Sequence, residues 1–118
     1  MWDVEFTDEF EAWWRLLSEQ EQEAVTAAVE ALEVRGPALG RPFVDVIHVS
    51  RHANMKEFRP RGGHIRVAFA FDPRRTAILL IGGDKTGKWE AWYEEMIPIA
   101  DGLFDEHQVA IEREGARE

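Results

Sequence analysis

The sequence predicts one small α+β domain in the order βααβββα, with helices packed on one face of a mostly antiparallel sheet. Three observations predict this class. Apolar and acidic residues alternate at the start of the chain, two capped helical patterns follow, and the middle holds three strand-like runs separated by short turns. A chain of 118 residues is about one domain, and no repeat or linker divides residues 1–118.

The first strand is expected over residues 2–6, because apolar and acidic residues alternate there with the period of a half-buried strand. An amphipathic helix is expected over residues 10–17, where aromatic residues recur at helical spacing. Thr7 and Asp8 precede this helix, and either side chain is able to cap its first turn.

The second helix has the clearest boundaries. Ser18 and Glu21 have the spacing of a capping box, and an apolar stripe follows that ends at Gly36 and Pro37. Glycine readily takes the left-handed conformation of a helix C-terminus, and proline stops propagation. The following Pro- and Gly-rich segment is expected to be a loop with a short extended piece over residues 44–49.

Three strands are expected next, separated by a Gly62–Gly63 turn and a turn at "DPRR". Their ranges are 55–59, 64–71 and 77–81, the last being an all-apolar central strand. Short turns imply antiparallel neighbours.

After a break at Gly82 and Gly83, a helical period runs from Trp89 almost to the end of the chain. We expect Pro98 to end or kink the first part of this helix.

The composition indicates in which cellular compartment the protein is expected. The chain has no cysteine, which excludes disulfides and thiolate metal sites and fits a reducing cytoplasm. Its acidic start lacks the apolar segment of a signal peptide, and its longest aliphatic run is too short to span a membrane. A soluble, cytoplasmic protein is therefore expected.

The charges are unevenly distributed. The formal net charge is -9, yet residues 51–88 carry +6 between segments of -8 and -7. A block of like charges persists either because strand geometry scatters it over a solvated surface or because an anion binds it.

Alternation along the 64–71 strand places Arg66 on one face beside small alanines, where a ligand has room to approach. Lys56 and Arg59 come from the neighbouring strand, and Lys85 and Lys88 from the loop after the last strand, so these cations are expected to converge. Several cations aimed at one phosphate stabilise the transition state of RNA cleavage without metal.

The alternatives are ordinary structural roles. Exposed strand and turn cations need no ligand, and the "DPRR" pair fits this interpretation best. Most of the tryptophans are typical of a hydrophobic core. Two other motifs are incomplete: "GGDKTGK" lacks the Ser or Thr of a P-loop, because Trp89 follows it, and His48 and His52 lack the glutamate of a zinc motif. We therefore expect no metal and no cofactor.

Four segments of the chain, taken in order, resemble the RelE/HigB toxins of bacterial type II toxin–antitoxin pairs, specifically the phage-derived HigB-like branch. These segments are "NMKEFR", "HIRVAFAFD", "AILLIGGDKTGKW" and "WYEEMIPIADGLFDEH". The resemblance covers nearly the whole chain. It implies a small α+β toxin that cleaves mRNA in the ribosomal A site without metal. It also implies silencing by an antitoxin, often one with a helix-turn-helix domain.

By position, the resemblance implies a catalytic set in which Arg66 clamps the phosphate and Lys56 is the candidate base. In the same set, Lys85 stabilises charge or the leaving group, and Tyr93 stacks or orients the substrate. The residues expected to bind RNA are Arg59, Arg61, Lys88 and Trp89.

The expected function is thus a ribosome-dependent mRNA endonuclease toxin. Two other functions stay open: a ParE-like toxin that binds DNA gyrase, and an inactive domain that only binds an antitoxin or another protein. The acidic flanks depart from the commonly basic composition of such toxins and disfavour association with naked RNA.

Overall fold

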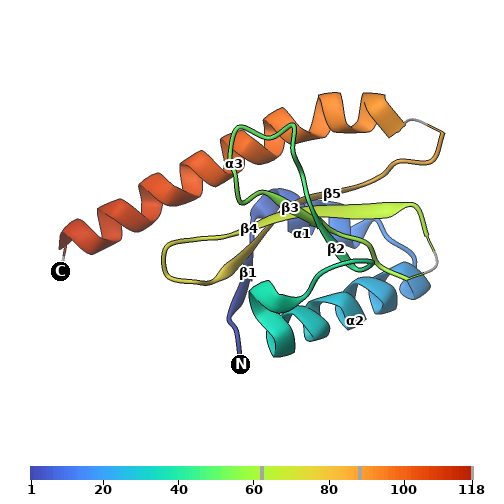
Figure 1. The fold of residues 1–118 in the computed structure, drawn as a ribbon, viewed down its shortest axis with the longest axis horizontal. Coiled ribbons are helices and arrows are strands. Elements are labelled where there is room, and N and C mark those ends of the chain that lie inside the picture. Colours follow the sequence, from blue (N-terminus) through green and yellow to red (C-terminus); the bar gives the residue numbers. More distant parts are fainter. Residues whose placement is uncertain (62, 88, 118) are drawn as a thin grey trace.

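Five strands form one sheet in the order β1-β5-β4-β3-β2, with helices on both of its faces (Figure 1). The structure is a computed structural model that describes residues 1–61, 63–87 and 89–117. β1 runs parallel to β5, and the other neighbours are antiparallel. The strands are β1 (Val4–Phe6), β2 (Val44–Val46), β3 (Lys56–Phe58), β4 (Ile65–Phe71) and β5 (Ala77–Asp84).

The first two helices begin at capped residues, as predicted. Thr7 caps α1 (Asp8–Arg15) by accepting a hydrogen bond from the Phe10 backbone N–H, which settles the choice between Thr7 and Asp8. Ser18 and Glu21 form the full capping box of α2 (Glu19–Arg35). A short 3-10 turn, η1 (Gly36–Ala38), follows α2, and Gly36 has the positive φ expected at this helix end.

The sheet buries a separate hydrophobic cluster on each face. On one face, Val25 and Leu32 of α2 pack with Val67 and Phe69 of β4. On the other face, the long helix α3 (Trp89–Arg117) covers the alanines of β4 and alternate residues of β5. The prediction of helices on one face is therefore wrong in this respect, because the central strands are apolar on both sides and each side must be covered.

The segment expected to be a loop contributes a fifth strand. β2 is three residues long and pairs antiparallel with β3 at the edge of the sheet, with Val44 opposite Phe58 and Val46 opposite Lys56. Buried Val44 anchors β2 in the first hydrophobic cluster.

The two glycines predicted to break the chain after residue 81 instead lie inside β5. A Cβ atom at Gly82 would overlap the Trp13 ring, and a Cβ atom at Gly83 would overlap the Trp92 ring on the other face. The glycines therefore let tryptophans from α1 and α3 pack directly on the backbone of β5.

α3 is one continuous helix, although Pro98 lies within it. Proline leaves the carbonyl four residues earlier without its helical partner. That carbonyl belongs to Glu94, and because both residues are exposed, water is able to replace the missing hydrogen bond. Pro98 thus does not end the helix, which extends beyond the sheet at its C-terminal end (Figure 1). Among the helices described, none combines the length and apolar character needed to cross a bilayer.

Gly83→Ala is expected to lower the free energy of unfolding by about 1–3 kcal/mol, because the new methyl group must displace the buried ring of Trp92. Gly102→Ala is the control, since this helical glycine faces open space and alanine should stabilise α3 by about 0.5–1 kcal/mol. Urea unfolding of both variants measures the difference. Equal stabilities for the two variants would contradict this packing.

Candidate functional site

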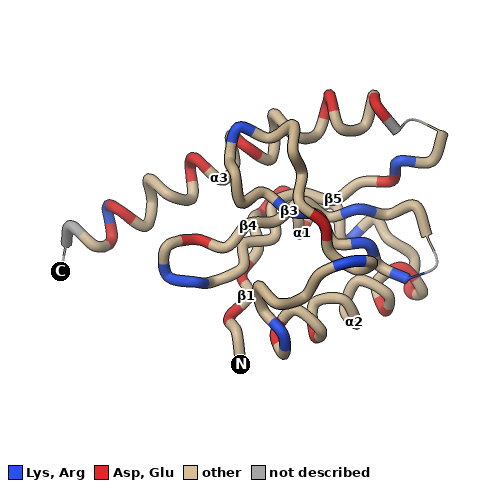
Figure 2. Tube along the Cα trace, in the orientation of Figure 1, with Lys and Arg blue, Asp and Glu red and all other residues tan. Residues whose placement is uncertain are grey.

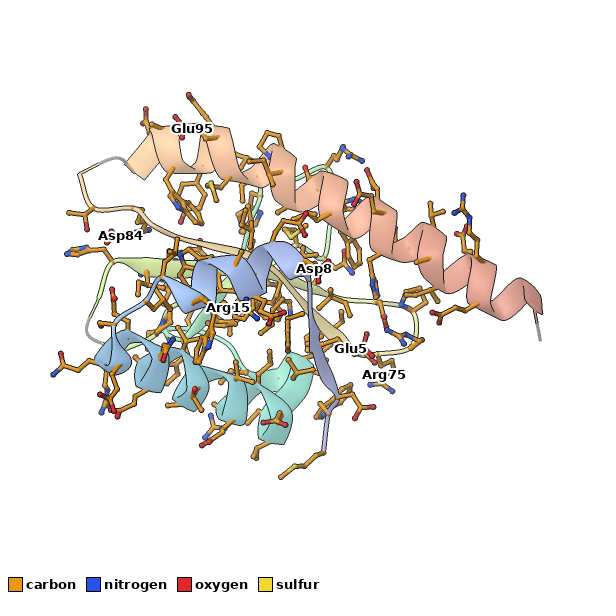
Figure 3. The ribbon with its side chains drawn as sticks, turned by 180° about the vertical axis from the view of Figure 1, so that it is seen from behind. Glu5, Asp8, Arg15, Arg75, Asp84 and Glu95 are labelled. Carbon is orange, nitrogen blue, oxygen red and sulfur yellow. The ribbon has the colours of Figure 1, made fainter. Side chains whose placement is uncertain are left out.

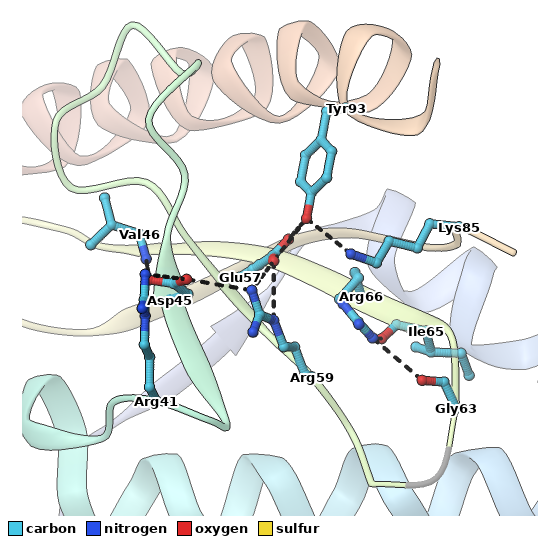
Figure 4. Close-up of polar contacts among 10 residues, drawn as sticks. All are labelled: Arg41, Asp45, Val46, Glu57, Arg59, Gly63, Ile65, Arg66, Lys85 and Tyr93. Atoms are coloured by element: carbon cyan, nitrogen blue, oxygen red, sulfur yellow. Dashed lines mark hydrogen bonds and ion pairs between the residues drawn. The ribbon is translucent and has the colours of Figure 1, made fainter. Parts of the chain in front are cut away.

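A cluster of charged side chains lies on the α3 side of the sheet, where β3, the start of β4, the end of β5 and the first turns of α3 meet (Figure 4). Glu57 of β3 lies opposite Ala68 of β4, and Arg66 lies opposite Gly83 of β5. Small residues at these partner positions leave room on this face for the long polar side chains.

Glu57 is at the centre of this cluster. Its side chain is buried, with the residue only 2% exposed. Both carboxylate oxygens lie 2.8 Å from the Tyr93 hydroxyl, and Oε1 also accepts hydrogen bonds from Arg59 Nη2 at 3.1 Å and Nε at 3.3 Å. A buried carboxylate requires such partners. Sequence analysis missed Glu57, although strand alternation opposite Lys56 was a signal for its inward position.

Tyr93 joins Glu57 to Lys85. The Lys85 ammonium donates a hydrogen bond to the Tyr93 hydroxyl at 3.2 Å and lies 5.2 Å from the centre of its ring. Burial and the hydrogen bond to Glu57 raise the pKa of Tyr93 to about 12. Tyr93 is therefore a neutral hydrogen-bond donor near pH 7.

Lys85 follows the end of β5 and is 2% exposed. Its burial, and next the nearby positive charge of Arg66, lower its pKa, whereas the charge of Glu57 acts in the opposite direction. Such an ammonium gives up its proton more readily than a lysine in water.

Arg66 is the cation of this cluster without a paired carboxylate. Its Nη1 donates to the backbone carbonyls of Ile65 at 2.8 Å and Gly63 at 3.4 Å, which fixes the guanidinium at the edge of the cluster. Within residues 1–61, 63–87 and 89–117, no carboxylate forms a salt bridge with Arg66, and its buried Nε has no hydrogen-bond partner. Burial lowers the pKa of Arg66, and the guanidinium stays charged at any physiological pH.

The structure thus brings together Arg59, Arg66, Lys85 and Tyr93. The prediction that Lys56 joins them is wrong. Lys56 lies opposite Phe69 on the α1–α2 face of the sheet, and its ammonium is 5.7 Å from the centre of the Phe71 ring. Adjacent strand residues point to opposite faces, so Lys56 and Glu57 are separated by the sheet itself.

The other predicted RNA-binding residues are not part of this cluster. Arg61 is exposed and lines a groove beside α2, on the opposite side of the molecule from α3. Lys88 lies outside the described residues, as does the side chain of Trp89.

Arg74 in the β4–β5 turn has a structural role. This turn lies at the end of the sheet opposite to the cluster (Figure 2). Arg74 donates hydrogen bonds to Asp72 at 2.9 Å and to Glu5 at 2.9 Å, and His107 of α3 is 2.9 Å from Asp72. Burial acts to raise the pKa of Asp72, but the hydrogen bonds from His107 and Arg74 outweigh it and hold that pKa below its ordinary value.

A groove of about 540 Å³ opens beside the cluster, between residues 45–49 and the first turns of α3. Glu57, Arg59 and Tyr93 form one wall of the groove. Its other lining residues are mostly apolar or acidic, and they include Ile97, Pro98, Glu90, Glu94 and Asp101. In the part of the chain that the structure describes, no group of three or more metal-ligating side chains is arranged around a common point.

Comparisons with known proteins agree on the family and on the fold of this chain. The family model described as "Phage derived protein Gp49-like" matches residues 12–105. A relative from Mycobacterium tuberculosis (strain ATCC 25618 / H37Rv), named "Putative toxin HigB3", is 54% identical over 91 residues, which are 77% of this chain and 80% of that relative.

Solved structures show the same fold. The isolated E. coli RelE toxin has a TM-score of 0.60 and 12% identity, covering 84% of this chain and 99% of the other. The archaeal RelE–RelB complex from Pyrococcus horikoshii OT3 has a TM-score of 0.59 and 14% identity, covering 74% and 97%. At this identity the likeness concerns the fold.

Tyr93 is the single tyrosine of the chain, so its ionisation can be followed without interference. We expect the tyrosinate absorbance of the folded protein to rise with a midpoint of about 12, because burial and Glu57 disfavour the phenolate. Circular dichroism at each pH is the control for unfolding. An early transition in the folded protein, at the ordinary tyrosine value of about 10, would contradict the contacts around Tyr93.

Proposed function

The chain belongs to the phage-derived Gp49-like family as a HigB/RelE-like toxin of the toxin–antitoxin type, and from this premise we propose that it cleaves mRNA on the ribosome. The observation that carries the proposal is the meeting of Arg66, Lys85 and Tyr93 on one face of the sheet. Cations beside a hydroxyl donor suit a phosphodiester whose negative charge increases during the reaction.

The proposed reaction is attack of a ribose 2′-oxygen on its own 3′-phosphate. The 2′-hydroxyl gives its proton to water as its oxygen bonds to phosphorus, the bond from phosphorus to the 5′-oxygen breaks, and that leaving oxygen takes a proton from Lys85. The products are a 2′,3′-cyclic phosphate and a 5′-hydroxyl. Protein side chains suffice for these steps when they hold the attacking and leaving oxygens in line.

Each residue of the cluster has a place in this reaction. We assign the phosphate clamp to Arg66, because this guanidinium forms no salt bridge within the described residues. Lys85 supplies positive charge and a proton for the leaving oxygen, since its lowered pKa favours proton donation. Tyr93 orients Lys85 and the substrate. Lys56 receives no catalytic role, because it lies on the other face.

Docking is proposed to depend on the ribosome. The chain carries a net charge of -9, and the groove beside the cluster is lined by Glu90 and Glu94. These charges repel naked RNA, so the cluster alone offers a small attractive surface in a repulsive protein. A ribosome that presents the message in a fixed position removes the need for tight binding to free RNA.

The proposed partner is a cognate antitoxin. The archaeal RelE that shares this fold was solved in a complex with RelB. We propose by analogy that an antitoxin binds this chain and silences it, and that it is a helix-turn-helix protein, as the HigB-like resemblance implies.

Arg66→Ala is expected to reduce cleavage of ribosome-bound mRNA by about 10²-fold or more, because the transition state loses its phosphate clamp. Lys56→Ala removes the same charge from the opposite face and is expected to cleave like the wild type. Transcript mapping after induction in a bacterium, at matched protein levels, measures both.

Intact transcripts during growth arrest would overturn the nuclease proposal. Arrest with DNA damage would instead support a gyrase-binding toxin, and unimpaired growth would support a domain that only binds a partner.

A further inference from the structure

We infer that Glu57 is the positioning residue of this site: its buried carboxylate orients Tyr93 and keeps Lys85 charged. The catalytic consequence rests on the proposed nuclease function, whereas the effect on Lys85 is independent of that function. Glu57 is thus an acidic member of a site that the sequence predicted from cations and an aromatic residue.

The hydrogen bonds run in one direction. Tyr93 has a single hydroxyl hydrogen, and the two oxygens of Glu57, each 2.8 Å away, are its acceptors. With that hydrogen committed to Glu57, the lone pairs of the Tyr93 oxygen face the ammonium of Lys85, which donates to them at 3.2 Å. The resulting chain from Lys85 through Tyr93 to Glu57 joins the end of β5, α3 and β3 (Figure 4).

The cations around Lys85 favour its loss of a proton, and the carboxylate of Glu57 opposes them. The facing groups are Arg66 from β4, Arg59 and Glu57 from β3 and its end, and the neutral hydroxyl of Tyr93 from α3. Asp84 precedes Lys85, and its carboxylate accepts hydrogen bonds from Thr86 in the exposed turn.

Two of these groups are cations, and Glu57 is an anion that counters them. Without its charge, burial and two positive neighbours would weigh more heavily on a buried ammonium, which is the form that low polarity disfavours. Glu57 therefore extends to higher pH the range in which Lys85 carries its proton.

Glu57 is not itself placed to react with RNA. It is buried, and its oxygens are occupied by Arg59 and Tyr93. A ribose hydroxyl would have to displace these donors to reach it. A role through Tyr93 and Lys85 fits the contacts, and a role as direct general base does not.

The test measures the titration of Lys85 directly. The chain has three lysines, so lysine-specific isotope labelling gives few NMR signals, and Lys85→Arg identifies the signal of Lys85. Glu57→Gln keeps the shape and removes the charge, and we expect it to move the Lys85 midpoint to lower pH.

Glu95→Gln is the matched control. It removes the same charge two residues beyond Tyr93, from an exposed side chain that points away from the sheet (Figure 3), and we expect it to leave the Lys85 midpoint in place. An unchanged midpoint in Glu57→Gln, or an equal shift in both variants, would overturn the inference.

Tyr93→Phe covers the case in which Glu57→Gln does not fold. It removes the hydroxyl that accepts from Lys85 but leaves the charge of Glu57 in place, so we expect a smaller shift of the Lys85 midpoint in the same direction. A midpoint equal to that of the wild type would overturn the chain of hydrogen bonds.

Cleavage of ribosome-bound mRNA across a pH series tests the catalytic consequence. In Glu57→Gln, activity should be lost at a lower pH on the alkaline side than in the wild type, because Lys85 loses its proton earlier. An unmoved alkaline limit together with a shifted Lys85 midpoint would overturn the catalytic part. A wild type that cleaves nothing would refute the nuclease proposal, while the NMR titration would still decide the role of Glu57.

Discussion

The site depends on one electrostatic constraint, the burial of the Glu57 carboxylate on the α3 face of the sheet. A buried carboxylate is tolerated only when donors surround it, and here Arg59 and Tyr93 supply them. Tyr93 comes from α3, so satisfying Glu57 also fixes the first turns of α3 over the end of β5. Lys85 is held by the same hydroxyl, and its charge is balanced by the same carboxylate. The geometry of the site and the attachment of α3 therefore have a common origin.

The remainder of the fold is a packed sheet that supports this cluster. Central strands with two apolar faces require cover on both sides, and α3 provides it on the side of the cluster. Glycines in β5 let the rings of Trp13 and Trp92 approach the backbone closely from opposite faces. At the far end of the sheet, Asp72 links the β4–β5 turn to α3 through His107. α3 is thus anchored at both ends of the sheet.

Few of the cations that the structure describes are available to bind RNA, which fits the proposal that the substrate is already held in place when it meets this site. Of the nine cations in residues 51–88, Arg74 in the β4–β5 turn binds acids of its own fold, its neighbour Arg75 lies over the Trp2 ring, and Lys56 faces the opposite layer. What remains on the α3 face is a small positive site beside an acidic groove. Such a surface suits a phosphate that is delivered to it better than a long stretch of free RNA. The E. coli RelE toxin shares the fold at 12% identity, so the fold is compatible with very different sequences.

The sequence by itself determined the elements whose signals are local. Helix caps, the glycine at the end of α2, strand alternation and the all-apolar run of β5 each act within a few residues, so the α+β class and the order of most elements followed from them. It also determined that Arg66 shares a face with small residues. Tertiary structure decided whatever depends on strand register and layer order: β2 as a fifth strand, α3 on the second face, and glycines kept inside β5 by tryptophans distant in sequence. The same dependence explains the site, because only the pairing of β3 with β4 and the position of α3 place Glu57 beside Tyr93 and Lys85 and leave Lys56 behind the sheet.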